Sequence, residues 1–215
     1  MESTAHAFLE EVLPLMNLHS RDRIIELGCG DGWACRRLAE SVTEGLIIGL
    51  DASNELVREA RAKSASFENI LYLWSNAEQI PWQENFFTSA LCVDSIYCFE
   101  DIKKVLSELL RVLTPGGSIW IVNREQKENG PSSPILSESS EAVSMLPPDD
   151  YLSLLRVSGF EDVAMHTLPY SSPGSPPGTP GTDDMPAHSR VILISARKPA
   201  DTHSASPEQA SANQL

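Results

Sequence analysis

The sequence has 215 residues, of which 41% are hydrophobic, and a formal net charge of −14 at pH 7. This length suits one domain that buries a full sheet, and no apolar run approaches the ~20 residues that cross a bilayer. Lys and Arg are scattered rather than clustered, which argues against nucleic acids and acidic membranes as partners because both require grouped cations. The N-terminus is acidic and lacks the positive region of a secretory signal, so we expect a cytoplasmic protein.

Hydrophobic periodicity predicts a series of alternating strands and helices. Residues 4–17 form an amphipathic helical pattern, and short apolar runs predict strands at residues 23–27, 46–50, 70–74, 90–93 and 118–122. Helical patterns lie between them at residues 33–41, 54–63 and 102–113. Strand–helix alternation predicts crossover connections and a mainly parallel sheet, which binds ligands at the carboxyl ends of its strands.

The pattern changes after residue 123. Residues 124–146 are polar and predict a long loop, followed by a helix at 149–158 and strands at 162–167 and 190–197. Residues 170–189 form a Pro/Gly-rich insertion, and residues 199–215 form a polar tail that we expect to be disordered. We therefore expect a single domain over residues 1–198.

Neither the cysteines nor the histidines show the spacing of a metal site. No C-x-x-C pair occurs among Cys29, Cys35, Cys92 and Cys98, which favours buried free thiols over disulfides. The five histidines are also spread without ligand spacing: His6, His19, His166, His188 and His203. We predict no metal site.

The strongest motif is the run from Ile24 to Trp33, IIELGCGDGW, which reads as a strand, a glycine-rich turn and a helix start. Glycines let the chain turn sharply and let a ligand approach the backbone. The spacing is G-x-G-x-G, whereas a dinucleotide fingerprint requires its third glycine where Trp33 stands. Asp51 ends the next apolar run, about 20 residues later, where a carboxylate can bind the hydroxyls of a ribose. Its alternative role is to cap the following helix, which Ser53 or Asn54 can do equally well.

Three later segments complete the pattern: SNAEQIPW at 75–82, VDSIY at 93–97 and RVLTPGGS at 111–118. Together with the glycine turn and Asp51, they resemble the class I S-adenosylmethionine-dependent methyltransferases that act on small molecules. The resemblance covers residues 4–125 in order and spacing, and residues 147–197 more loosely. It implies a Rossmann-like, doubly wound, mainly parallel seven-stranded sheet with helices on both faces and an antiparallel last strand.

The resemblance also implies a cofactor site for S-adenosyl-L-methionine. It places Glu26 and the backbone of Gly28, Cys29 and Gly30 on the methionine moiety, with Glu26 near its ammonium. It places Asp51 on the ribose, and Val93 with its carbonyl toward the ammonium. The residues implied for the adenine are Ala52, Asn76 and Ala77.

The acceptor is expected to be a small molecule, whose identity and whose methylated atom the sequence does not indicate. The Asn-Pro-Pro-Tyr type of tetrapeptide is absent after Val93, which argues against nucleobase methylation. A general base is needed only for an acceptor of high pKa, and weak candidates are Asp94, Tyr97 and Glu100. Their alternative roles are structural, such as the charged first turn of a helix.

Two other readings stay open. A non-catalytic binding or scaffold protein with the same fold is compatible with Thr88 and Ser89, which stand where the family usually has an acidic residue after the aromatic Phe87. An NAD-dependent oxidoreductase would share the sheet and Asp51, but the glycine spacing and Asn76-Ala77 disfavour it. The oligomeric state is not indicated.

Overall fold

A computed structural model describes residues 4–124, 146–169 and 190–200, and the expected loop, Pro/Gly-rich insertion and tail therefore fall almost entirely outside the described residues. The helices are α1 (Thr4–Met16), α2 (Trp33–Ala39), α3 (Asn54–Lys63), η1 (Ile96–Cys98, a 3₁₀ turn), α4 (Ile102–Val112) and α5 (Pro148–Val157). The strands are β1 (Arg23–Leu27), β2 (Leu46–Asp51), β3 (Ile70–Trp74), β4 (Phe87–Val93), β5 (Leu113–Arg124), β6 (Glu161–Pro169) and β7 (Arg190–Arg197).

The seven strands form one sheet in the order β3-β2-β1-β4-β5-β7-β6. The pairs from β3 to β5 are parallel, whereas β7 runs antiparallel to both β5 and β6. The expected mainly parallel sheet with an antiparallel last strand is confirmed. Strand order reverses between β1 and β4, and such a switch point is where open α/β sheets leave a crevice for a ligand.

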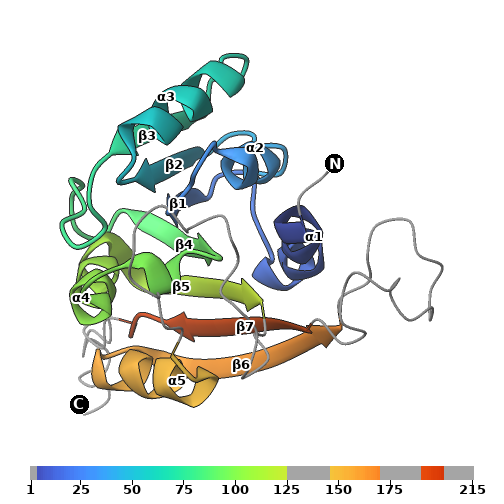
Figure 1. Ribbon diagram of the computed structural model, residues 1–215. Coiled ribbons are helices and arrows are strands. Elements are labelled where there is room, and N and C mark those ends of the chain that lie inside the picture. The colour runs from blue at the N-terminus through green and yellow to red at the C-terminus, as the bar shows by residue number, and fades with distance from the viewer. Residues whose placement is uncertain (1–3, 125–145, 170–189, 201–215) are drawn as a thin grey trace, which may run out of the picture.

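Helices cover both faces of this sheet, and Figure 1 shows them on its two sides. One buried cluster joins the sheet to α1, α2 and α3, and its centre includes Leu9, Leu38 and Val57. The other joins the opposite face to α4 and α5 through Leu106, Leu109 and Leu155. Because both faces are covered, the central strands are mostly apolar, which is why the sequence shows them as short hydrophobic runs.

Several element ends differ from the expectation by a few residues, and the larger differences have a visible cause. β4 begins at Phe87 rather than residue 90, and β5 begins at Leu113 rather than residue 118. Phe87 pairs with Leu113, and the Thr114 hydroxyl donates to the Phe87 carbonyl at 3.1 Å. Residues 114–117, which lie before the expected strand, therefore form an irregular start of β5. The Gly116 amide donates to the Lys198 carbonyl at 3.0 Å, and the Lys198 amide donates to the Gly117 carbonyl at 2.8 Å.

Candidate functional site

The glycine-rich turn joins β1 to α2 at the carboxyl edge of the sheet. Gly28, Gly30 and Gly32 all have positive φ angles, of 70°, 54° and 78°. The amides of Gly28 and Cys29 donate to the Leu50 carbonyl at 2.8 and 3.1 Å. The turn is thus fixed to the end of β2, which brings the two strands expected to hold the cofactor together.

The three glycines have different surroundings. A β-carbon on Gly32 would collide with the ring of Tyr72, and one on Gly28 would lie 2.5 Å from the Ser95 Cβ. A β-carbon on Gly30 would meet no atom of the described residues within 4 Å. Packing therefore requires glycine at positions 28 and 32, whereas Gly30 faces open space where a ligand can approach the backbone.

Asp51 lies at the end of β2, beside this open position. One carboxylate oxygen accepts a hydrogen bond from the Gly30 amide and the other accepts one from the Ser53 amide, both at 2.8 Å. The cap of α3 is Ser53, whose hydroxyl accepts from the Leu56 amide at 3.3 Å. The structure therefore assigns the helix cap to Ser53, and the second lone pair on each Asp51 oxygen stays available to a ligand hydroxyl.

Glu26 lies under the turn, and only 2% of its surface is exposed. Its carboxyl accepts a hydrogen bond from the Cys35 thiol at 2.8 Å. Burial, with smaller contributions from the charges of Asp51 and Asp31, raises the pKa of Glu26 to about 8. No ion pair joins Glu26 to a cation within the described part of the chain.

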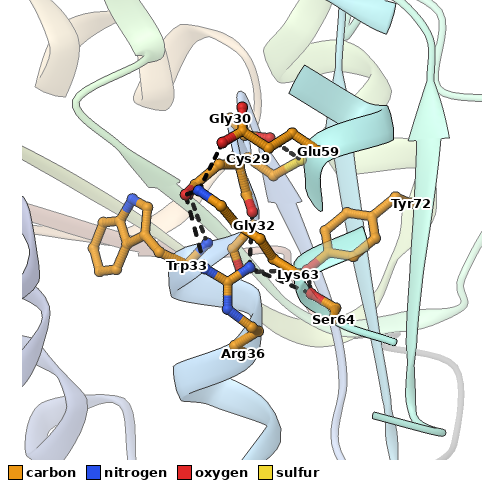
Figure 2. A network of polar contacts seen from close by, with 10 residues as sticks. Cys29, Gly30, Gly32, Trp33, Arg36, Glu59, Lys63, Ser64 and Tyr72 are labelled. Carbon is orange, nitrogen blue, oxygen red and sulfur yellow. Dashed lines mark hydrogen bonds and ion pairs between the residues drawn. The ribbon is translucent and has the colours of Figure 1, made fainter. Parts of the chain in front are cut away.

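A polar network holds the outer side of the turn to α2 and α3 (Figure 2). The Lys63 ammonium bonds to the Asp31 carboxylate at 2.6 Å and to Glu59 at 2.7 Å. The Arg36 guanidinium donates to the Asp31 carbonyl at 2.8 Å. Burial opposes ionisation of Asp31, but the bond from Lys63 and the charges of Lys63 and Arg36 outweigh it and hold the pKa of Asp31 below its usual value. Of the acidic side chains around the turn, Asp31 is therefore neutralised by cations.

The expected adenine-binding residues follow β2 and β3. Ala52 comes directly after Asp51, and Ala77 is buried in the loop after β3. The Asn76 side-chain oxygen accepts from the Glu78 amide at 2.9 Å, which fixes the conformation of this loop. Trp74, which the sequence analysis did not single out, ends β3 with 62% of its surface exposed, and its indole N–H donates to the Ala52 carbonyl at 2.9 Å.

The end of β4 carries the remaining candidates. Val93 is buried, and Asp94 follows with a φ of 48°, which is uncommon for a residue other than glycine and often marks functional sites. Tyr97 lies in η1 and packs partly against the core, whereas Glu100 is exposed just before α4. The cofactor candidates and Asp94 thus meet at one edge of the sheet, and Glu100 lies in the connection beyond it.

The cysteines only partly match the expectation. Cys29, Cys35 and Cys92 are buried free thiols, but Cys98 in η1 is exposed. Partial burial, together with the charges of Asp51 and Asp94, raises the pKa of the Cys98 thiol. Both carboxylates therefore act electrostatically on this thiol.

Contacts between distant residues are what the sequence analysis missed. Lys63 is 32 residues from Asp31, and Ser95 is 68 residues from Leu27, whose carbonyl it binds at 2.8 Å. Leu27, Asp31 and Ser95 lie within motifs that were singled out, but nothing in those motifs indicated these partners. Trp74 is read as an ordinary strand residue from its apolar neighbours.

Comparison with known proteins shows similarity to methyltransferases. Residues 25–121 match the family model described as "Methyltransferase domain". The ubiquinone/menaquinone biosynthesis C-methyltransferase UbiE of Wigglesworthia glossinidia brevipalpis is 30% identical over 127 residues, covering 57% of this chain and 51% of the relative. An O-methyltransferase, cnsE, of Penicillium expansum is 25% identical over 145 residues, covering 65% and 52%. The chain spans about half the length of these relatives.

The fold is shared with solved structures. A SAM-dependent methyltransferase from Aquifex aeolicus superposes with a TM-score of 0.70 at 19% identity, covering 92% of this chain and 94% of the other. The seven-stranded order and the helices on both faces are therefore those of a known architecture. No helix among the described residues is long and apolar enough to cross a membrane.

Proposed function

We propose that the chain is a class I S-adenosylmethionine-dependent methyltransferase that transfers a methyl group to a small molecule by in-line displacement. The match to the methyltransferase-domain family model over residues 25–121 and the shared fold support this proposal. The observation that carries this proposal is the turn between β1 and α2. It offers open space over Gly30, whose amide is bonded to the Asp51 carboxylate, and it lies over the buried Glu26. Neither acidic side chain forms an ion pair within the described residues.

The charge of this turn distinguishes two cofactors that bind similar folds. S-adenosylmethionine carries an ammonium and a sulfonium, which an acidic cradle attracts. The pyrophosphate of NAD is an anion, and the same carboxylates would repel it. Dinucleotide sites usually leave the helix N-terminus free to bind this group. The structure therefore favours the sulfonium cofactor.

The roles of the individual residues follow from their places around the turn. Glu26 and the backbone of Gly28, Cys29 and Gly30 would hold the methionine moiety. Asp51 would accept both ribose hydroxyls. Ala52, Asn76 and Ala77 would hold the adenine, and the Val93 carbonyl would face the ammonium.

The cofactor, when bound, supplies a methyl group that is already activated by the positive sulfur. The residues named above would hold the cofactor so that this methyl group faces the acceptor. The protein therefore has to align the acceptor opposite the sulfur and exclude water. The rigid attachment of the turn to β2 fixes one side of this alignment.

We propose Asp94 as the general base, ahead of Tyr97 and Glu100. The two relatives named above are a C-methyltransferase and an O-methyltransferase, and carbon acids and hydroxyls both need to lose a proton. Asp94 lies at the carboxyl end of β4, and its charge, like that of Asp51, raises the pKa of the Cys98 thiol. Tyr97 packs partly into the core, and Glu100 is exposed away from the strand ends.

The net charge bears on the acceptor and the setting. An uncharged or cationic small molecule approaches a chain of net charge −14 more easily than an anion does. Free thiols and the acidic surface fit a cytoplasmic protein that binds neither nucleic acid nor membranes.

Calorimetric titration with S-adenosylhomocysteine tests the proposal, with NAD titrated in parallel. We expect micromolar binding of the thioether alone, weakened in Asp51→Ala. A folded protein that binds NAD but not the thioether would refute the assignment, and binding without turnover on any acceptor would favour the scaffold reading.

A further inference from the structure

The hydrogen-bonded ladder between β1 and β4 ends before β1 does. Its last paired residues are Glu26 and Leu91, so the Leu27 carbonyl lies beyond the ladder. That carbonyl accepts a hydrogen bond from the Ser95 hydroxyl at 2.8 Å, and the Cys92 thiol lies 3.6 Å from the same oxygen. The Ser95 side chain thus joins the end of β1 to the segment after β4, at the switch point where the two strands diverge.

Ser95 also fills the space under the glycine turn. It is only 7% exposed, and a β-carbon on Gly28 would lie 2.5 Å from its Cβ and 2.9 Å from its Oγ. Gly28 therefore packs directly on Ser95, and neither residue can grow without moving the other. The Cys92 thiol is 3.0 Å from the Ser95 hydroxyl, which closes a small buried polar cluster.

The backbone of Ser95 connects this cluster to the acceptor side of the site. Its carbonyl accepts from the Cys98 amide at 2.9 Å, which starts η1. The preceding residue, Asp94, has the positive φ noted above, and its amide donates to the Val122 carbonyl at 2.8 Å. One buried serine is therefore bonded to the end of β1 and also sets the turn that carries Asp94.

We propose that Ser95 is a positioning residue that holds the glycine-rich turn against the β4 turn, so that cofactor affinity depends on its hydroxyl. This inference rests on the proposed function. Removing the hydroxyl leaves the buried Leu27 carbonyl with only a weak thiol donor, and a buried acceptor without a strong partner costs free energy. The turn then relaxes away from the geometry that presents the Gly28–Gly30 backbone to the ligand.

The first experiment compares Ser95→Ala with Ser89→Ala. Ser89 is a matched control because it lies on β4, the strand just before Ser95, and has the same 7% exposure, and its hydroxyl has no hydrogen-bond partner among the described residues. We expect Ser95→Ala to weaken S-adenosylhomocysteine binding by about 5- to 10-fold and Ser89→Ala to leave it unchanged. Ser95→Cys, which keeps the size and a weak donor, should lie between the two and serves if the alanine variant does not fold.

Hydrogen exchange of the ligand-free protein separates this inference from the proposed function. We expect faster exchange of the Gly28, Cys29 and Gly30 amides in Ser95→Ala than in Ser89→Ala. Wild-type protein that binds no thioether would refute the proposed function, whereas the exchange result would still decide the role of Ser95. Unchanged affinity and unchanged exchange in Ser95→Ala would overturn the inference.

A second test uses the contact with Gly28. Gly28→Ala should lose thioether binding, because the new methyl meets Ser95 and the φ of 70° strains an alanine. Adding Ser95→Gly removes the collision but not the strain, so the double variant should regain part of the affinity. Equal loss in the single and double variants would show that the two residues do not act on each other.

Discussion

Asp51 and Gly30 are 21 residues apart in sequence and are joined by a 2.8 Å hydrogen bond from the Gly30 amide to the Asp51 carboxylate. This bond ties the open position of the glycine turn to the residue expected to bind the ribose. The two parts of the cofactor site therefore cannot move independently, and a change at Asp51 acts on both.

Asp51→Ala should weaken S-adenosylhomocysteine binding by ~1.5–3 kcal/mol, through the lost ribose bonds and the released Gly30 amide. Asp51→Asn keeps one acceptor oxygen and replaces the other with a donor, which faces the Gly30 or Ser53 amide. We expect its loss to be close to that of the alanine variant. Calorimetry on both variants checks this, and an asparagine variant with wild-type affinity would show that the charge and the second oxygen are not needed.

Gly30→Val should abolish cofactor binding with little further effect on the fold. Its β-carbon meets no atom of the described residues within 4 Å, so the new side chain fills the ligand space, and the φ of 54° adds strain. Gly116→Val is a matched control, since Gly116 also has a positive φ, of 77°, and open surroundings, but lies at the start of β5. The two variants should lose similar thermal stability, and only the first should lose thioether binding. Equal binding in both would place the ligand elsewhere.

The sequence predicts the sheet well because its central strands are covered on both faces. The mostly apolar run at Arg23–Leu27 marks the central strand β1 to the residue, and the run at Ile70–Trp74 does the same for the edge strand β3. It predicts the beginning of β5 poorly. The first residues of this strand, from Leu113, depend on pairing with Phe87 and Lys198, which are distant in the chain. Helix boundaries are closest where a local cap exists, as for α3, where Ser53 caps Asn54–Lys63.

The candidate site shows the same distinction between features with a local sequence signal and features that depend on distant residues. The glycine turn and Asp51 have local signals, namely a glycine spacing and a carboxylate at a strand end. The neutralisation of Asp31 by Lys63, the burial of Glu26 against Cys35 and the bond from Ser95 to Leu27 depend on the packed fold. No pattern of neighbouring residues encodes these contacts, so they become visible only when the elements are assembled.

Cys98 should be the first cysteine to react with iodoacetamide, because the other three thiols are buried. Its raised pKa means that the rate near pH 7.5 is low and increases as the pH rises toward the thiol pKa. S-adenosylhomocysteine should protect it, because the charge of Asp51, the residue proposed to bind the ribose, acts on this thiol. Asp94→Asn should speed the reaction by lowering the thiol pKa. Peptide mass spectrometry measures each rate, and labelling that ignores the thioether would place Cys98 outside the cofactor cleft.

Glu26→Gln should change how stability depends on pH. The pKa of Glu26 is about 8 in the folded protein, against an ordinary value of 4.5, so the folded state binds more protons than the unfolded state between these pH values. Stability from this group is therefore fully present below about pH 4.5 and is lost as the pH rises through 8. Its limit is roughly 3–5 kcal/mol, since each unit of pKa corresponds to about 1.4 kcal/mol.

The ligand-free glutamine variant should accordingly match the wild type at pH 5 and unfold at a higher temperature at pH 8.5. Bound cofactor should reverse the order, because its ammonium favours the ionised carboxylate and the glutamine variant cannot supply that charge. Thioether affinity of the wild type should then increase from pH 6 to pH 8.5 and stay flat in the variant. If the melting temperatures of the wild type and the variant differ by the same amount at pH 5 and pH 8.5, Glu26 is ionised in the folded protein. A cation would then already lie beside it.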